Sequence, residues 1–152
     1  MLQRIQTVYL AIALILLGLM AWLPLAEISV ADTVYSFSTK GVVHESSGKV
    51  LQNGIPLMVM LGIALLLQVV IIFGYKKRIQ QMRLATYNII LMLGMIGLFF
   101  YFKYATFKDM EVDLVNYKIA LVFPFVAAIL NYLAIRAIGK DEALVRSIDR
   151  IR

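Results

Sequence analysis

The sequence contains no cysteine and only one histidine, His44. Without cysteine the chain can form no disulfide framework, thiolate metal site or iron–sulfur cluster, and it has no cysteine nucleophile. One histidine cannot supply the pair of imidazoles that most zinc, copper or bis-histidine haem sites need. The GxSxG, HExxH, P-loop and dinucleotide-binding patterns are missing as well. We therefore expect a non-enzymatic protein with no cofactor and with no catalytic, cofactor-binding or metal site.

Charged residues are scarce, at 16% of 152 residues, whereas hydrophobic residues reach 62%. Average soluble domains are about half apolar and about a quarter charged. The mean hydropathy of +0.85 points to a chain that is solvated by lipid. The net charge of +6 comes from short basic clusters beside apolar runs, which is typical of membrane topology signals. The composition predicts an integral membrane protein whose partner is the lipid bilayer, and it predicts no nucleic-acid partner.

Four apolar runs without interior charges approach the length of a membrane crossing. A helix needs roughly 20 residues to span ~30 Å of hydrocarbon, and none of the runs shows the alternation of a membrane β-strand. The first run, after Arg4, has an alternative interpretation as a secretory signal peptide. It is longer than the usual core of about 7–15 residues, and Pro24 stands where a small residue is expected, so we expect it to be retained. The predicted fold class is an all-α membrane protein, a single four-helix transmembrane domain over residues 1–152 with spans at 8–25, 54–75, 84–102 and 117–135.

Basic residues indicate how this domain is oriented. Ten of the fifteen Lys and Arg residues lie in the N-terminus, the second connection and the tail, and five lie in the first and third connections. Cytoplasmic segments of membrane proteins carry the excess of positive charge. The distribution predicts a multi-pass protein with both termini and the second connection in the cytoplasm.

Two connections are expected to face water on the outer side. The first, residues 26–53, holds β-branched and aromatic segments and a turn signal, which predicts two or three short strands in a small antiparallel sheet. His44 lies in this loop, and we expect an exposed residue beside a turn. The third connection alternates charge, and a metal site at Asp109, Glu111 and Asp113 is an alternative to the solvated rim that we expect there.

The tail, residues 140–152, combines an apolar stripe with a graded charge pattern. Gly139 is expected to interrupt the helix that leaves the membrane, and Asp141 and Glu142 would then favour the N-terminus of a new helix. The sequence predicts a short cytoplasmic amphipathic helix that contacts either the anionic membrane surface or a partner protein. The candidate contact residues are Leu144, Val145, Arg146, Ile148, Arg150 and Ile151.

Polar side chains inside the predicted spans are few and carry no charge. Gln68, Asn88 and Asn131 are expected to pack helices against one another through amide hydrogen bonds, with a solute pathway as the alternative. Pro124 is expected to kink the fourth span.

The two ends of the chain carry a family resemblance. The opening MLQRIQTVYL and the closing RAIGKDEALVRSIDRIR resemble a domain-of-unknown-function family of small four-span inner-membrane proteins of the Bacteroidetes. The resemblance implies four helices in a bacterial cytoplasmic (inner) membrane. It implies no activity and no site residues.

These observations favour an accessory or structural subunit of an envelope complex, with a protein partner or a homo-oligomer. A small-solute channel or transporter, built by oligomerisation around Gln68 and Pro124, is the main alternative. A lipid-modifying enzyme that uses His44 or the acidic residues of the third connection is another.

Overall fold

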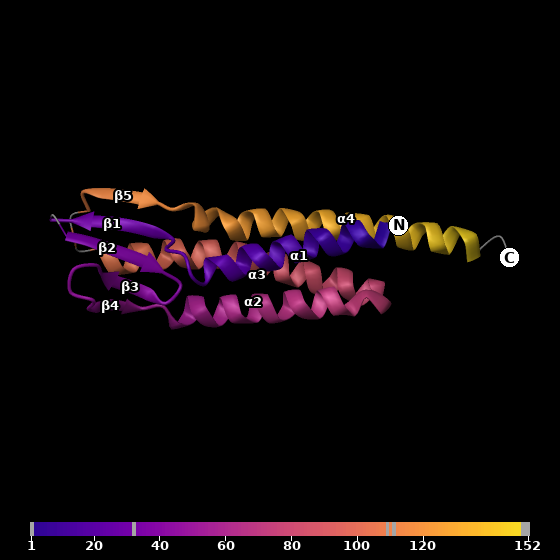
Figure 1. The fold of residues 1–152 in the computed structure, drawn as a ribbon, viewed down its shortest axis with the longest axis horizontal. Coiled ribbons are helices and arrows are strands. Elements are labelled where there is room, and N and C mark those ends of the chain that lie inside the picture. Colours follow the sequence, from indigo (N-terminus) through magenta and orange to yellow (C-terminus); the bar gives the residue numbers. More distant parts are fainter. Residues whose placement is uncertain (1, 32, 109, 111, 150–152) are drawn as a thin grey trace.

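Four α-helices lie side by side in the computed structural model, and a small sheet covers one end of them (Figure 1). The structure describes residues 2–31, 33–108, 110 and 112–149, without the side chains of residues 2–4, 76 and 145–149. The helices are α1 (Leu2–Met20), α2 (Ile55–Phe73), α3 (Arg78–Phe107) and α4 (Phe123–Asp149), and the 3₁₀ turns η1 (Gly74–Lys76) and η2 (Ile119–Val122) precede α3 and α4.

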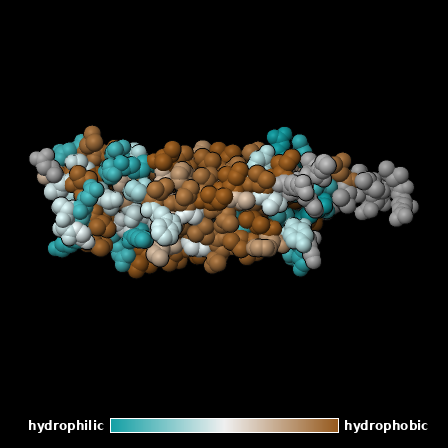
Figure 2. All heavy atoms as spheres, in the orientation of Figure 1, coloured by the Kyte–Doolittle hydropathy of each residue, from teal (hydrophilic) through white to brown (hydrophobic). Residues whose placement is uncertain are grey.

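Three helical segments are long and apolar enough to cross a membrane by length and composition: Ile55–Phe73, Arg78–Phe107 and Ile119–Leu144. The apolar part of α1, Ile5–Met20, is shorter. Figure 2 shows hydrophobic residues covering the middle of the bundle, with hydrophilic residues gathered toward its two ends. Such a band is what a surface in contact with lipid hydrocarbon requires.

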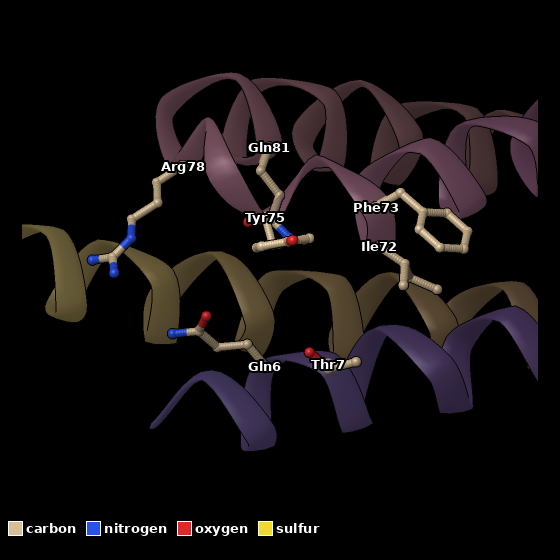
Figure 3. Close-up of a pocket in the computed structure, with 7 residues that line it drawn as sticks. All are labelled: Gln6, Thr7, Ile72, Phe73, Tyr75, Arg78 and Gln81. Atoms are coloured by element: carbon tan, nitrogen blue, oxygen red, sulfur yellow. The ribbon is translucent and has the colours of Figure 1, made fainter. Parts of the chain in front are cut away.

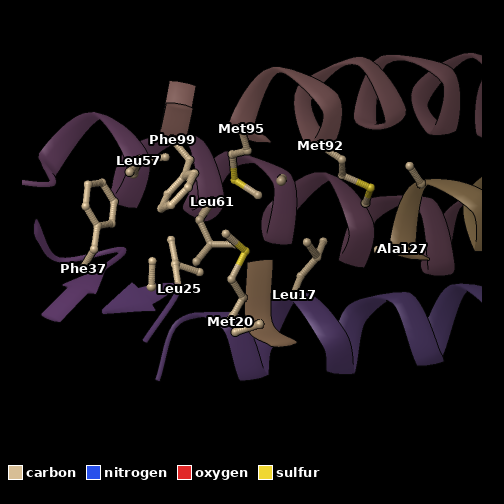
Figure 4. Close-up of a cluster of buried hydrophobic side chains, with 14 of the residues drawn as sticks. Leu17, Met20, Leu25, Phe37, Leu57, Leu61, Met92, Met95, Phe99 and Ala127 are labelled. Carbon is tan, nitrogen blue, oxygen red and sulfur yellow. The ribbon is translucent and has the colours of Figure 1, made fainter. Parts of the chain in front are cut away.

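The helices pack in a ring, because α1 contacts α2 and α4, and α3 contacts α2 and α4. Small residues are fully buried on α1, α2 and α4, which allows close approach of the helix backbones. Larger apolar side chains fill the remaining space from α1 to the sheet (Figure 4). The core is therefore continuous from the bundle into the sheet.

Five antiparallel strands form the sheet, in the order β4-β3-β2-β1-β5. Four of them follow one another between α1 and α2, and the fifth comes from the connection between α3 and α4 and pairs with β1, where Glu27 lies opposite Asn116. The sheet rests on the bundle through Phe37, whose ring centroid lies 4.7 Å from that of Phe99 on α3. The strands are β1 (Ala26–Val30), β2 (Thr33–Ser38), β3 (Gly41–His44), β4 (Val50–Asn53) and β5 (Leu114–Tyr117).

The connections contain more regular structure than the sequence predicts. The first forms four strands instead of two or three, and the third is no simple rim, since α3 continues to Phe107 and β5 follows. The fourth helix begins at Phe123 and not at residue 117, because residues 114–117 pair with β1. Lys118 then reinforces this pairing, with its Nζ 2.7 Å from Glu27 Oε1.

Pro124 does not kink a helix, contrary to expectation. It is the second residue of α4, where the backbone N–H has no intrahelical acceptor and proline is readily accommodated. The residue therefore marks the start of the helix.

The prediction of a separate tail helix that begins after Gly139 is also wrong. α4 passes through Gly139 without interruption and ends at Asp149. A glycine inside a helix costs only about 1 kcal/mol relative to alanine, and the residues that follow it include good helix formers. The tail is therefore an extension of the fourth helix.

We expect the substitution Gly139→Ala to raise the free energy of unfolding by up to about 1 kcal/mol. An added Cβ would lie 3.8 Å from Met82 Sδ, an ordinary van der Waals contact. Thermal melting of the detergent-purified protein measures the effect. A clear drop in melting temperature would mean that the helix bends at this glycine.

Candidate functional site

Two buried amide side chains connect three helices inside the bundle. Gln68 on α2 and Asn88 on α3 are fully buried. Asn88 Nδ2 donates a hydrogen bond to Gln68 Oε1 at 2.7 Å, and Gln68 Nε2 donates to the carbonyl oxygen of Leu10 on α1 at 2.9 Å. Amides neither carry charge nor exchange protons near neutral pH, so this chain of hydrogen bonds can fix helix positions but supplies no acid or base.

Asn131 on α4, the third amide predicted to pack helices, lies apart from that pair. Its Nδ2 donates to the carbonyl oxygen of Ala127 at 3.0 Å, within its own helix, and lies 3.8 Å from Met92 Sδ on α3. The structure thus buries all three predicted amides and brings only two of them together.

His44 and Asp113 each accept a hydrogen bond from the backbone of a nearby loop. Ser47 N donates to His44 Nδ1 at 3.3 Å, Ser46 Oγ lies 3.0 Å from the same atom, and Tyr35 packs edge-on against the imidazole. Asp113 Oδ2 accepts a hydrogen bond at 2.8 Å from the backbone of Ala31, which has a positive φ of 45°. Asp109 and Glu111 lie outside the described residues. Within the described part of the chain, no group of three or more His, Asp or Glu residues is placed to hold a metal ion.

The predicted contact residues of the tail are described only in part. Leu144 is half-exposed on α4. The side chains of Val145, Arg146 and Ile148 are not described, and Arg150 and Ile151 lie outside the described residues. A contact between this segment and lipid or protein stays a prediction.

A cavity that the sequence does not reveal lies at the end of the bundle opposite the sheet. It measures about 310 Å³ and opens between α1, α2, η1 and α3 (Figure 3). Its polar lining residues stand at the edges of apolar runs, where a polar residue is ordinary, so no local signal distinguishes them. We call it the basal cavity, and its lining residues are Gln6, Thr7, Ile72, Phe73, Tyr75, Arg78 and Gln81.

Hydrogen bonding holds one wall of the basal cavity in place. Gln81 on α3 is buried, and its Nε2 donates to the carbonyl oxygen of Ile71 at 2.9 Å. A second cavity of about 470 Å³ shares Phe73, Tyr75 and Gln81 with it and also reaches Lys77. Together the two cavities flank the turn between α2 and α3.

Comparison with known proteins gives a family and no activity. Residues 2–151 match DUF4293, a domain of unknown function. No curated protein matches the chain. No solved structure matches it either. Because the match extends over nearly the whole sequence, the chain belongs to the DUF4293 family.

Proposed function

We propose that this chain is a multi-pass protein of a bacterial inner membrane, in which all four helices cross the bilayer as one bundle. The apolar band of Figure 2 supports this arrangement, as do the three helical segments of sufficient length. The apolar part of α1, Ile5–Met20, rises ~24 Å at 1.5 Å per residue, and Trp22, Leu23 and Leu25 continue the apolar run beyond the helix. The start of α1, the turn between α2 and α3, and the end of α4 lie at one end of the bundle (Figure 1). Of the thirteen basic residues among those that the structure describes, eight belong to the segments at this end, which is therefore cytoplasmic.

Within that membrane the protein acts as a non-enzymatic accessory or structural subunit of an envelope complex. One observation carries this proposal: the sheet at the other end of the bundle ends in the edge strands β4 and β5, and among the described residues β5 pairs with β1 alone. Leu114 and Tyr117 on β5 are 65% and 47% exposed. An open edge with exposed apolar side chains invites pairing with another chain, which most proteins prevent with charge, proline or cover.

The bundle interior agrees with a structural role. Its buried hydrogen-bonded side chains include the amides of Gln68 and Asn88, which join helices and offer no titratable group. Transport and proton pathways usually place ionisable residues at this depth. The interior of the described bundle thus favours a scaffold over a transporter or an enzyme.

Co-purification tests this role with two matched substitutions, one on the edge strand and one on an inner strand of the sheet. Leu114 on β5 and Val34 on β2 both lie directly opposite Ser29 on β1, so each is the neighbour of the same residue. Both side chains are exposed, but Leu114 is on the edge strand and Val34 is on an inner strand. The native protein is extracted in mild detergent, and mass spectrometry identifies whatever protein accompanies it at comparable stoichiometry.

We expect Leu114→Lys to lower recovery of that partner about tenfold or more, because a lysine on an edge strand opposes strand pairing. Val34→Lys adds the same charge to an inner strand and is expected to leave recovery nearly unchanged. Equal loss of the partner in both variants would assign the contact to the face of the sheet and contradict a contact at the edge strand β5. If no other protein accompanies the wild type at comparable stoichiometry, the accessory role itself is wrong.

A further inference from the structure

The basal cavity contains two buried hydrogen-bond donors that have no acceptor among the described residues. Gln6 is 7% exposed, and its Nε2 is buried without a partner. Nη1 of Arg78 is likewise buried without a partner. The two side chains reach toward the same space from α1 and α3 (Figure 3). Buried donors without acceptors are costly, especially when one belongs to a charged group, so a bound acceptor would relieve both.

The lining of the basal cavity selects an anion. None of its seven residues is acidic, and Arg78 brings a permanent positive charge. Arg78 is also the first residue of α3, a helix whose first turn has no acidic residue and whose N-terminus has no side-chain cap. The partial positive charge of a helix N-terminus adds to that of the guanidinium. A guanidinium beside an amide N–H and a helix N-terminus is suited to the oxygens of a phosphate group.

Apolar side chains that line another part of the same cavity suggest what carries the phosphate. Phe73 is 75% exposed and lines the basal cavity together with Ile72. These residues end α2, where the apolar band gives way to the basic end of the molecule. Basic pockets between transmembrane helices at the cytoplasmic side are suited to anionic lipid headgroups.

We propose that the basal cavity binds the phosphate group of an anionic phospholipid from the cytoplasmic leaflet. Arg78 and Gln6 donate hydrogen bonds to the phosphate oxygens, and the lipid's glycerol and acyl chains lie along Ile72 and Phe73. The lipid as the source of the phosphate rests on the membrane arrangement proposed above. Recognition of a phosphate group by these two donors does not depend on it.

The test measures binding of three small probes to the 152-residue protein in a non-ionic detergent by isothermal titration calorimetry. Dihexanoyl phosphatidylglycerol carries both the phosphate and acyl chains, inorganic phosphate carries only the anion, and dihexanoylglycerol carries only the chains. We expect the phosphatidylglycerol to bind more tightly than either of the other two. If inorganic phosphate binds equally well, the phosphate site is supported and the lipid as its source is overturned.

Substitutions then connect binding to the two donors. Arg78→Gln is expected to weaken phosphatidylglycerol binding about tenfold or more, since a charge-assisted hydrogen bond is lost. The control Arg83→Gln removes the same charge from an exposed position on the same helix and is expected to change affinity less than about twofold. Equal weakening of binding in both variants would mean that general surface charge attracts the lipid, and it would overturn the proposed site.

Two milder substitutions test the same site if Arg78→Gln does not fold. Arg78→Lys keeps the charge and loses the planar fork, and Gln6→Leu removes the uncharged donor while nearly keeping the volume. Each is expected to weaken phosphatidylglycerol binding several-fold with an unchanged elution volume in size-exclusion chromatography. Wild-type affinity in both variants, or no binding to the wild type, would overturn the site. Neither result depends on whether a partner protein binds at β5.

Discussion

Replacing Gly54 by alanine is expected to lower the free energy of unfolding by at least about 3 kcal/mol. Gly54 is buried where β4 passes into α2, and its N–H donates to the carbonyl oxygen of Lys40 at 3.0 Å. An added Cβ would lie 2.5 Å from the Lys40 carbonyl carbon and 2.6 Å from the Thr39 carbonyl oxygen, and closer still to the nitrogen of Gly41. All three atoms belong to the backbone, so no side-chain rotation can relieve the overlap. The sheet and the start of α2 would have to separate.

The matched control for this loss is Gly62→Ala, in the middle of α2. An added Cβ at Gly62 meets no atom within 4 Å, and alanine is the better helix former. Its stability should therefore be equal to that of the wild type or up to about 1 kcal/mol higher. For a chain of this size 1 kcal/mol shifts the melting temperature by roughly 2–4 °C, so Gly54→Ala should melt at least ~6 °C lower. A melting temperature near that of the wild type would contradict the close backbone contact between Gly54 and Gly41.

The helices could be predicted from the sequence because each apolar run is continuous and excludes strand periodicity. Their ends could not, and Arg78 illustrates why. Six residues of α3 precede Leu84, where the predicted span begins, and they include Arg78 and Gln81. Hydropathy locates the part of a helix that suits lipid, but a helix continues as long as its backbone hydrogen bonds and packing allow.

The sequence does not predict strand β5, because its stabilising contacts come from far along the chain. The segment Leu114–Tyr117 is four residues long and follows an alternating charge pattern. Its pairing with β1 joins residues separated by almost ninety positions, for example Glu27 and Asn116. A short strand of this kind gains its hydrogen bonds only in the folded chain, so local propensity gives little signal.

For the candidate sites too, some residues can be recognised in the sequence, whereas their contacts depend on the fold. Gln68 and Asn88 could be recognised as polar groups in apolar runs, but their mutual hydrogen bond depends on how two helices are rotated about their axes. The basal cavity is harder still to predict, because Gln6 and Arg78 are 72 positions apart and each is unremarkable near the end of an apolar run. Only the fold brings the two donors together.

A second large loss of stability is expected for Gln68→Leu, which disrupts the hydrogen-bonded pair of Gln68 and Asn88. This substitution removes the acceptor of Asn88 Nδ2 and leaves that donor buried without a partner. It also removes the hydrogen bond from Gln68 Nε2 to the Leu10 carbonyl oxygen. We expect the free energy of unfolding to fall by about 1–3 kcal/mol, as measured by denaturant titration of the detergent-purified protein.

A double substitution distinguishes loss of the hydrogen bond between Gln68 and Asn88 from loss of apolar packing. In Gln68→Leu with Asn88→Leu both polar partners are gone, so no donor is left unpaired between α2 and α3. The double variant should therefore be more stable than the sum of the two single losses implies, by roughly 0.6–1.7 kcal/mol. Asn131→Leu is the control, since the Asn131 amide bonds within α4 and its loss should add to that of Gln68→Leu. The losses of unfolding free energy in Gln68→Leu and Asn88→Leu could instead add without any coupling, as in the control. In that case the hydrogen bond between the two side chains does not hold α2 to α3, and the apolar packing around them does.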